Sequence, residues 1–165
     1  MDIQRFVKHL MTPPAKVKRH FPQSVLHAIE HAIAASEAQH SGEIRFVVEG
    51  ALDGAPLFKG QSPRDRALDL FSELRVWDTE FNNGLLIYVL LADRAVEIVA
   101  DRGINAQVAA STWTHICQQM EQAFQQSSFE SGVVSGVQAI TQQLAQHFPA
   151  NSQLGNELPN QAVVL

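Results

Sequence analysis

Acidic side chains in three short stretches of this 165-residue sequence could together bind a metal ion. The first stretch holds Glu43, the second is residues 76–80 (VWDTE), and the third holds Asp101. Carboxylate oxygens are the ligands that Ca²⁺ and Mg²⁺ prefer in proteins. We therefore predict Asp78, Glu80 and Asp101 as candidate metal ligands. An ion held there could serve a hydrolase, in particular a phosphatase, because it polarises a phosphoryl oxygen and activates water.

Three predicted strands would bring these stretches to one edge of a sheet. Apolar side chains alternate with other residues in 43–48 and in 95–100, and an unbroken apolar run fills residues 85–91. A helix predicted to begin at Ser62 separates the first two strands, so as sheet neighbours they should run parallel. A short turn joins the last two, which should run antiparallel. The starts of the first two strands and the end of the third then meet at one edge.

We call this edge the acidic rim, and we expect further side chains there beside the three candidate ligands. They are Glu37, Glu43, Arg45, Trp77 and Arg102. Glu37 falls in the last turn of its helix, where the helix dipole disfavours a carboxylate by about 0.3–1 kcal/mol. It should therefore meet Arg45, Arg102 or a metal. Alternatively, the rim carboxylates form salt bridges and caps that hold the loop before the central strand. Trp77 would cover the core edge or offer a platform to a substrate.

One further motif has the spacing of a zinc site. His27, Glu30 and His31 match the His-x-x-Glu-His pattern of some metalloproteases. Ile29 and Ile33 would bury the opposite face of that helix, so we expect two solvated histidines there. The sequence contains no nucleophile elbow, P-loop or dinucleotide-binding glycine pattern, and it identifies no catalytic residue.

Composition indicates the class of protein and its cellular compartment. Hydrophobic residues make up 45% of the chain and charged residues 18%, as in ordinary globular proteins. The single cysteine, Cys117, cannot form an internal disulfide, which favours a reducing compartment. No stretch resembles a signal peptide or approaches the roughly 20 apolar residues of a membrane span. We therefore expect a cytoplasmic protein with no transmembrane segment.

Charge is unevenly distributed along the chain. The net charge is −5, yet residues 1–21 carry five Lys and Arg residues against Asp2 alone. The acidic body argues against nucleic acid as a partner, since phosphate binding needs a broad basic face. The N-terminal helix should pack on its own domain or on a second copy. The alternative is that it lies on a membrane surface.

The order of elements predicts an α/β fold, a three-layer α/β/α sandwich around a mixed sheet. We divide the chain into a basic amphipathic helix and linker (residues 1–21), a domain (22–148) and a polar C-terminal tail (149–165). Residues 49–61 hold three glycines and should form a loop. Ser127 and Glu130 should form a capping box at the start of the last helix.

Three sequence blocks resemble the signature of the TPM domain family, also called the TLP18.3/Psb32/MOLO-1 family. They are residues 82–89 (NNGLLIYV), 93–98 (DRAVEI) and 103–104 (GI). The resemblance covers residues 22–148 and is closest to a bacterial cytoplasmic branch without signal peptide or membrane anchor. It implies a sheet of about four strands. After Gly103 and Ile104, this chain has residues 105–107 (NAQ) where many relatives carry acidic residues.

The resemblance also implies a range of functions. Family members are linked to membrane-protein maintenance, some bind divalent cations at an acidic site, and one has been assigned phosphatase activity. Bacterial members often neighbour LemA-like membrane proteins. We therefore expect a non-catalytic interaction or assembly module with a protein partner, such as a LemA-like protein or another TPM membrane protein. The alternative is a hydrolase that uses Ca²⁺ or Mg²⁺ at the acidic rim.

Overall fold

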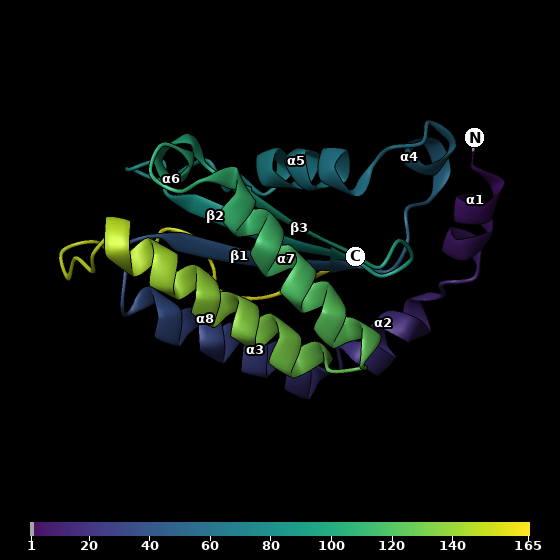
Figure 1. The fold of residues 1–165 in the computed structure, drawn as a ribbon, viewed down its shortest axis with the longest axis horizontal. Helices are drawn as coiled ribbons and strands as arrows, with labels where there is room; N and C mark the ends of the chain where they lie inside the picture. Colours follow the sequence, from purple (N-terminus) through teal and green to yellow (C-terminus); the bar gives the residue numbers. More distant parts are fainter. Residues whose placement is uncertain (1) are drawn as a thin grey trace.

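A computed structural model describes residues 2–165, in which a mixed sheet lies between two layers of helices (Figure 1). The strands, in the spatial order β3-β2-β1-β4, are β1 (Glu43–Glu49), β2 (Gly84–Leu90), β3 (Ala95–Ala100) and β4 (Val163–Val164). The helices are α1 (Ile3–Leu10), α2 (Pro14–His20), α3 (Gln23–Glu37), α4 (Gly54–Phe58), α5 (Pro63–Glu73), α6 (Arg102–Asn105), α7 (Ala110–Gln125) and α8 (Phe129–His147). The predicted α/β/α sandwich is confirmed.

The register of the sheet confirms the predicted edge. β1 and β2 run parallel with Glu43 opposite Gly84, and β3 runs antiparallel to β2 with Ala100 opposite Leu85. A side chain at position 84 would clash, because its Cβ would lie 1.9 Å from the carbonyl oxygen of Val76. Glycine therefore lets the loop after α5 pass directly over the start of β2.

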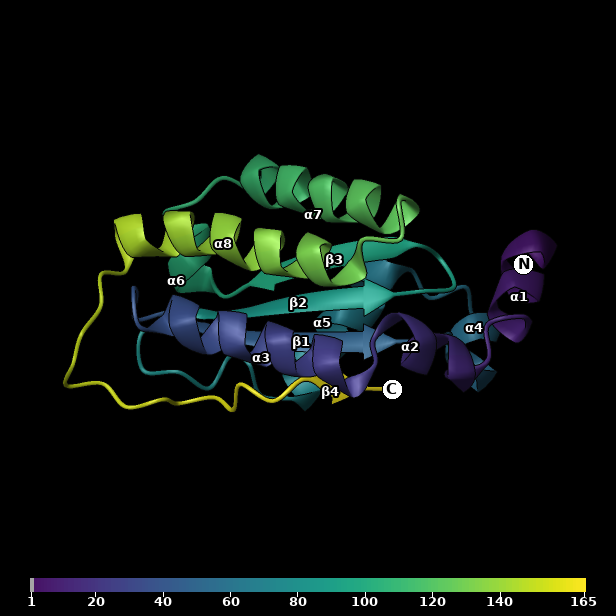
Figure 2. The same ribbon diagram turned by 90° about the horizontal axis from the view of Figure 1, so that it is seen from below.

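Each face of the sheet has its own apolar core. Helices α3, α7 and α8 cover one face, and α5 covers the other (Figures 1 and 2). Every residue of β1 and β2 is buried. This two-sided burial explains the unbroken apolar run in 85–91, since a central strand covered on both faces needs apolar residues at every position.

Four short elements were not predicted, namely α2, α4, α6 and β4. Each spans no more than seven residues, so its sequence period is too brief to read. Residues 49–61 are consequently not a plain loop, since they contain α4. The predicted Ser127–Glu130 capping box is wrong, because α8 begins after Ser128 and Ser127 has a φ of +59°.

The C-terminal segment predicted as a polar tail runs back along the molecule beside α3 (Figure 2). Its last residues form β4, which pairs in parallel with Val47 and Val48. The sheet thus reaches four strands only through a segment that lies far from the others in sequence. Within residues 2–165, no helix is both long enough and apolar enough to cross a membrane.

Candidate functional site

The structure does not gather the three candidate metal ligands into one cluster. The Asp78 carboxylate pairs with Arg75 at 2.7 Å and is half exposed. The main-chain N–H of Glu80 donates to the carboxylate of Glu157 at 3.1 Å. Asp101 caps α6, accepting from the N–H of Arg102 at 2.7 Å, while its Oδ2 is buried with no hydrogen-bond partner. Within residues 2–165, no group of three or more His, Cys, Asp or Glu side chains lies close enough to hold a metal ion.

Glu37 lies at the acidic rim without an arginine partner among residues 2–165. Its carboxylate accepts from the N–H of Ile44, at the start of β1, at 2.9 Å. Burial raises the pKa of Glu37 to about 7, the neighbouring Glu43 adds to this effect, and the bond from Ile44 partly opposes it. Glu37 thus ties the end of α3 to the sheet.

Glu43 and Arg45 point from β1 toward the C-terminal segment. The Glu43 carboxylate accepts from the N–H groups of Glu157 and Leu158, both at 3.2 Å, and burial raises its pKa. Arg45 donates through Nη1 to the carbonyls of Pro159 and Gln161. Both charged side chains belong to buried residues, 6% exposed in each case.

The other two rim residues lie nearer the solvent. Arg102 donates from Nε to the side-chain oxygen of Asn82 at 3.0 Å. Trp77 is 46% exposed, and the Arg75 guanidinium lies 5.5 Å from the centre of its ring. Trp77 therefore does not plug the core edge, one of the two roles expected for it.

Sequence reasoning missed a residue that belongs to the same arrangement. The carboxylate of Glu30, on α3, accepts from the N–H of Ala162 at 2.9 Å. Together Glu30, Glu43 and Arg45 line what we call the tail groove, along the outer edge of β1, in which residues 157–165 lie. The only sequence signal for this arrangement was the apolar AVVL ending of an otherwise polar segment. His27 and His31, which flank Glu30 in the predicted motif, are both exposed, as expected.

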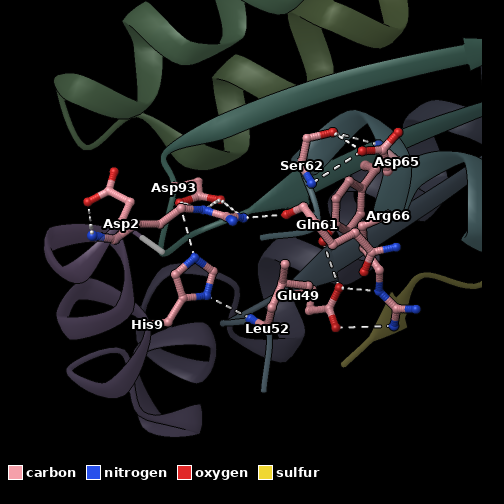
Figure 3. A network of polar contacts seen from close by, with 11 residues as sticks. Asp2, His9, Glu49, Leu52, Gln61, Ser62, Asp65, Arg66 and Asp93 are labelled. Carbon is pink, nitrogen blue, oxygen red and sulfur yellow. Dashed lines mark hydrogen bonds and ion pairs between the residues drawn. The ribbon is translucent and has the colours of Figure 1, made fainter. Parts of the chain in front are cut away.

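Two further polar networks lie at the opposite end of β1 (Figure 3). In one, Glu49 at the end of β1 binds Arg66 of α5 and accepts from the Tyr88 hydroxyl at 2.6 Å. In the other, Asp93 in the β2–β3 turn binds Arg5 and His9 of α1. These networks join helices to the sheet.

A cavity of about 640 Å³ lies between β3 and α7. Side chains occupy the free edge of β3 there, because Glu121 accepts from the N–H of Val96 at 2.9 Å and Arg64 donates to the carbonyl of Ile98 at 2.6 Å. Burial raises the pKa of Cys117, which lines this cavity, to about 12. The thiol is therefore protonated at neutral pH and is not an activated nucleophile.

Comparisons with known proteins agree with this architecture. A family model described as TPM domain matches residues 19–143. The NMR structure of the BA42 protein from the psychrophilic bacterium Bizionia argentinensis is 32% identical, covers 86% of this chain and 93% of that chain, and superposes with a TM-score of 0.75.

The N-terminal domain of a P. gingivalis protein shares the fold at 21% identity. The match covers 73% of this chain and 76% of that one, with a TM-score of 0.58. The comparison with curated proteins found no match. On the family match and on the likeness to BA42, the chain belongs to the TPM domain family.

Proposed function

We propose that this protein is a non-catalytic interaction module that works in the cytoplasm and holds an extended protein segment in the tail groove. The observation that supports this is the type of atom that the groove recognises. Within residues 2–165, the hydrogen bonds of Glu30, Glu43 and Arg45 all go to main-chain N–H and C=O groups of residues 157–162. Main-chain groups are common to all sequences, so such a groove suits many extended segments.

Glu43 and Arg45 find their hydrogen-bond partners in the segment that occupies the groove. With the segment in place both residues are 6% exposed, and its main-chain groups compensate the two buried charges. In this structure the chain's own C-terminal segment fills the groove. Few side chains of this segment anchor it to the domain. β4 has two residues, and within residues 157–165 Leu158 is the one buried side chain. A competing segment could therefore replace it at limited cost.

The family resemblance suggests the class of partner. TPM relatives are linked to membrane-protein maintenance, so the partner segment would belong to a membrane protein, such as a LemA-like protein or another TPM protein. The segment would add a strand beside β1 in the place of β4, a recurring mode of peptide recognition.

The experiment keeps every residue of the groove and frees its occupant. A protease site built into the exposed residues 151–153 allows the chain to be cut, after which a fluorescent peptide of residues 155–165 is added. Exchange into the groove should raise the anisotropy of the peptide. Glu43→Gln should weaken the exchange, whereas Glu130→Gln, the same change at an exposed site on α8, should not. A cut protein that never exchanges its segment would refute the proposal, because the segment would then be a fixed strand.

A second candidate function rests on two oxygen atoms at the acidic rim. Asp101 Oδ2 and the side-chain oxygen of Asn83 are both buried without a hydrogen-bond partner among residues 2–165. Oxygen ligands suit Ca²⁺ or Mg²⁺, which Asp78 and Glu80 would help to hold in a metal-dependent phosphatase. Among the residues described, however, the nearest carboxylates do not form a ready cluster.

Calorimetric titration with Ca²⁺, Mg²⁺ and Mn²⁺ tests this candidate. Asp101→Asn is a suitable variant, because asparagine caps a helix as well as aspartate does and should preserve α6. Binding that is lost in Asp101→Asn and in Asp78→Asn, with metal-stimulated release of phosphate, would support the hydrolase. Absence of heat with all three ions would remove it.

A further inference from the structure

Helix α1 presents a row of large apolar side chains to the solvent. Ile3, Val7, Leu10 and Met11 are 69%, 45%, 69% and 74% exposed. The spacing of Ile3, Val7 and Leu10 places them on one face of the helix, and Met11 follows directly as its C-cap. Phe58 of α4, which is 60% exposed and packs on Phe6 with ring centres 5.3 Å apart, adjoins this helix. We call the side chains of Ile3, Val7, Leu10 and Met11 the α1 face.

The opposite side of α1 is fixed to the domain, so its orientation is determined. Arg5 forms two bonds from Nε and one from Nη2 to the Asp93 carboxylate, and it donates to the carbonyl of Gln61 at 2.7 Å. The buried His9 accepts from the N–H of Leu52 at Nδ1, so its Nε2 carries a proton and donates to Asp93 at 3.0 Å (Figure 3).

The positive charge of Arg5 is balanced within this network by the carboxylate of Asp93. Burial alone would raise the pKa of Asp93, but the hydrogen bonds from Arg5 and His9 lower it, so the carboxylate stays ionised. Arg5 and His9 thus hold one side of α1 against the domain, and the α1 face points to the solvent. In both ribbon views α1 lies at one end of the molecule, beyond α4 and α2 (Figures 1 and 2).

Cations lie on α1 and on the next helix along the chain, α2. Lys8 on α1 and Lys16, Lys18 and Arg19 on α2 form no ion pair among residues 2–165. Asp2 is the one acidic residue before Glu30, and its carboxylate accepts from the N–H groups of Gln4 and Arg5 at the start of α1. The chain as a whole carries a net charge of −5, so this end differs in sign from the rest.

We propose that α1 and α2 dock this protein on an anionic lipid surface. The four side chains of the α1 face would enter the boundary between headgroups and acyl chains, and the exposed Lys8, Lys18 and Arg19 would lie among the phosphates. A lipid surface fits better than an acidic protein, because it offers an apolar layer directly beneath a plane of negative charge. The inference does not rest on the tail groove.

Sedimentation with vesicles tests the proposal on the full chain. One set contains phosphatidylcholine alone and the other phosphatidylcholine with phosphatidylglycerol. We expect binding to the anionic set, weakened by added salt. Lys18→Gln with Arg19→Gln should lower the affinity about 30-fold, since each cation near an anionic surface contributes about fivefold.

The apolar half of the proposal needs its own variants. Leu10→Gln with Met11→Gln should also abolish most of the binding, whereas Leu68→Gln, at a 45% exposed site on α5, should leave it unchanged. Failure of the unmodified protein to bind either vesicle set would overturn the proposal. So would light scattering that shows a dimer dissociated by Leu10→Gln and Met11→Gln, since a second copy would then cover the α1 face. Neither pair of variants touches the tail groove, so peptide exchange there is tested separately.

Discussion

Arg66 of α5 balances the buried carboxylate of Glu49 at the end of β1, and its removal gives the sharpest test of what that charge requires. Its Nε and Nη2 atoms donate to the Glu49 carboxylate at 3.0 and 3.2 Å, and the hydroxyl of the fully buried Tyr88 donates to the same carboxylate (Figure 3). Burial alone would lower the pKa of Arg66, but the bonds to Glu49 raise it. Arg66 is therefore ionised in the folded protein.

Arg66→Met keeps the apolar stem of the side chain and removes the guanidinium. Glu49 would then be a buried carboxylate with Tyr88 as its remaining hydrogen-bond donor. Breaking a buried pair from one side costs about 3–5 kcal/mol, because the other charge is left without compensation. Tyr88→Phe should cost less, about 1.5–3 kcal/mol, since it removes a single hydrogen bond to a charged group.

The free energy of unfolding in urea measures both losses. Arg75→Met is the matched control, because Arg75 forms an exposed ion pair with Asp78 and its side chain is 66% exposed. Such pairs contribute about 0–1 kcal/mol. If Arg66→Met were no more destabilising than Arg75→Met, the reasoning that Glu49 depends on Arg66 would be refuted.

Two other predictions concern the acidic rim and the glycines. Because burial raises the pKa of Glu37 from 4.5 to about 7, the folded protein holds a proton there that the unfolded chain has released. Stability should therefore fall by up to about 3 kcal/mol as pH rises between those values, and Glu37→Gln should flatten this fall in unfolding measurements across that range. Gly84→Ala should cost more than about 3 kcal/mol, since the new Cβ meets the main chain of Val76 at 1.9 Å. Gly136→Ala should cost clearly less, because its Cβ meets the flexible side chain of Met120, and equal losses in thermal unfolding would contradict this reasoning.

Local sequence patterns were enough to predict the fold class and the edge of the sheet where charged residues gather. Alternation in 43–48 and 95–100 and the apolar run in 85–91 are local patterns, and each reflects how a strand is covered on its two faces. The chain order then allowed few arrangements of three strands and one crossover helix. The family resemblance also rests on these local blocks.

The contacts of the polar side chains, by contrast, could not be predicted before the chain was folded. Arg45 meets carbonyls that lie more than a hundred residues further along the chain, and Glu30 meets an N–H equally far away. No local period encodes such a contact, because it depends on the path of a polar segment that has no period of its own. The amphipathic pattern of α1 could likewise be recognised in the sequence. Which side of the helix faces the domain depends on Asp93, which binds Arg5 and His9 and lies far from them in the chain.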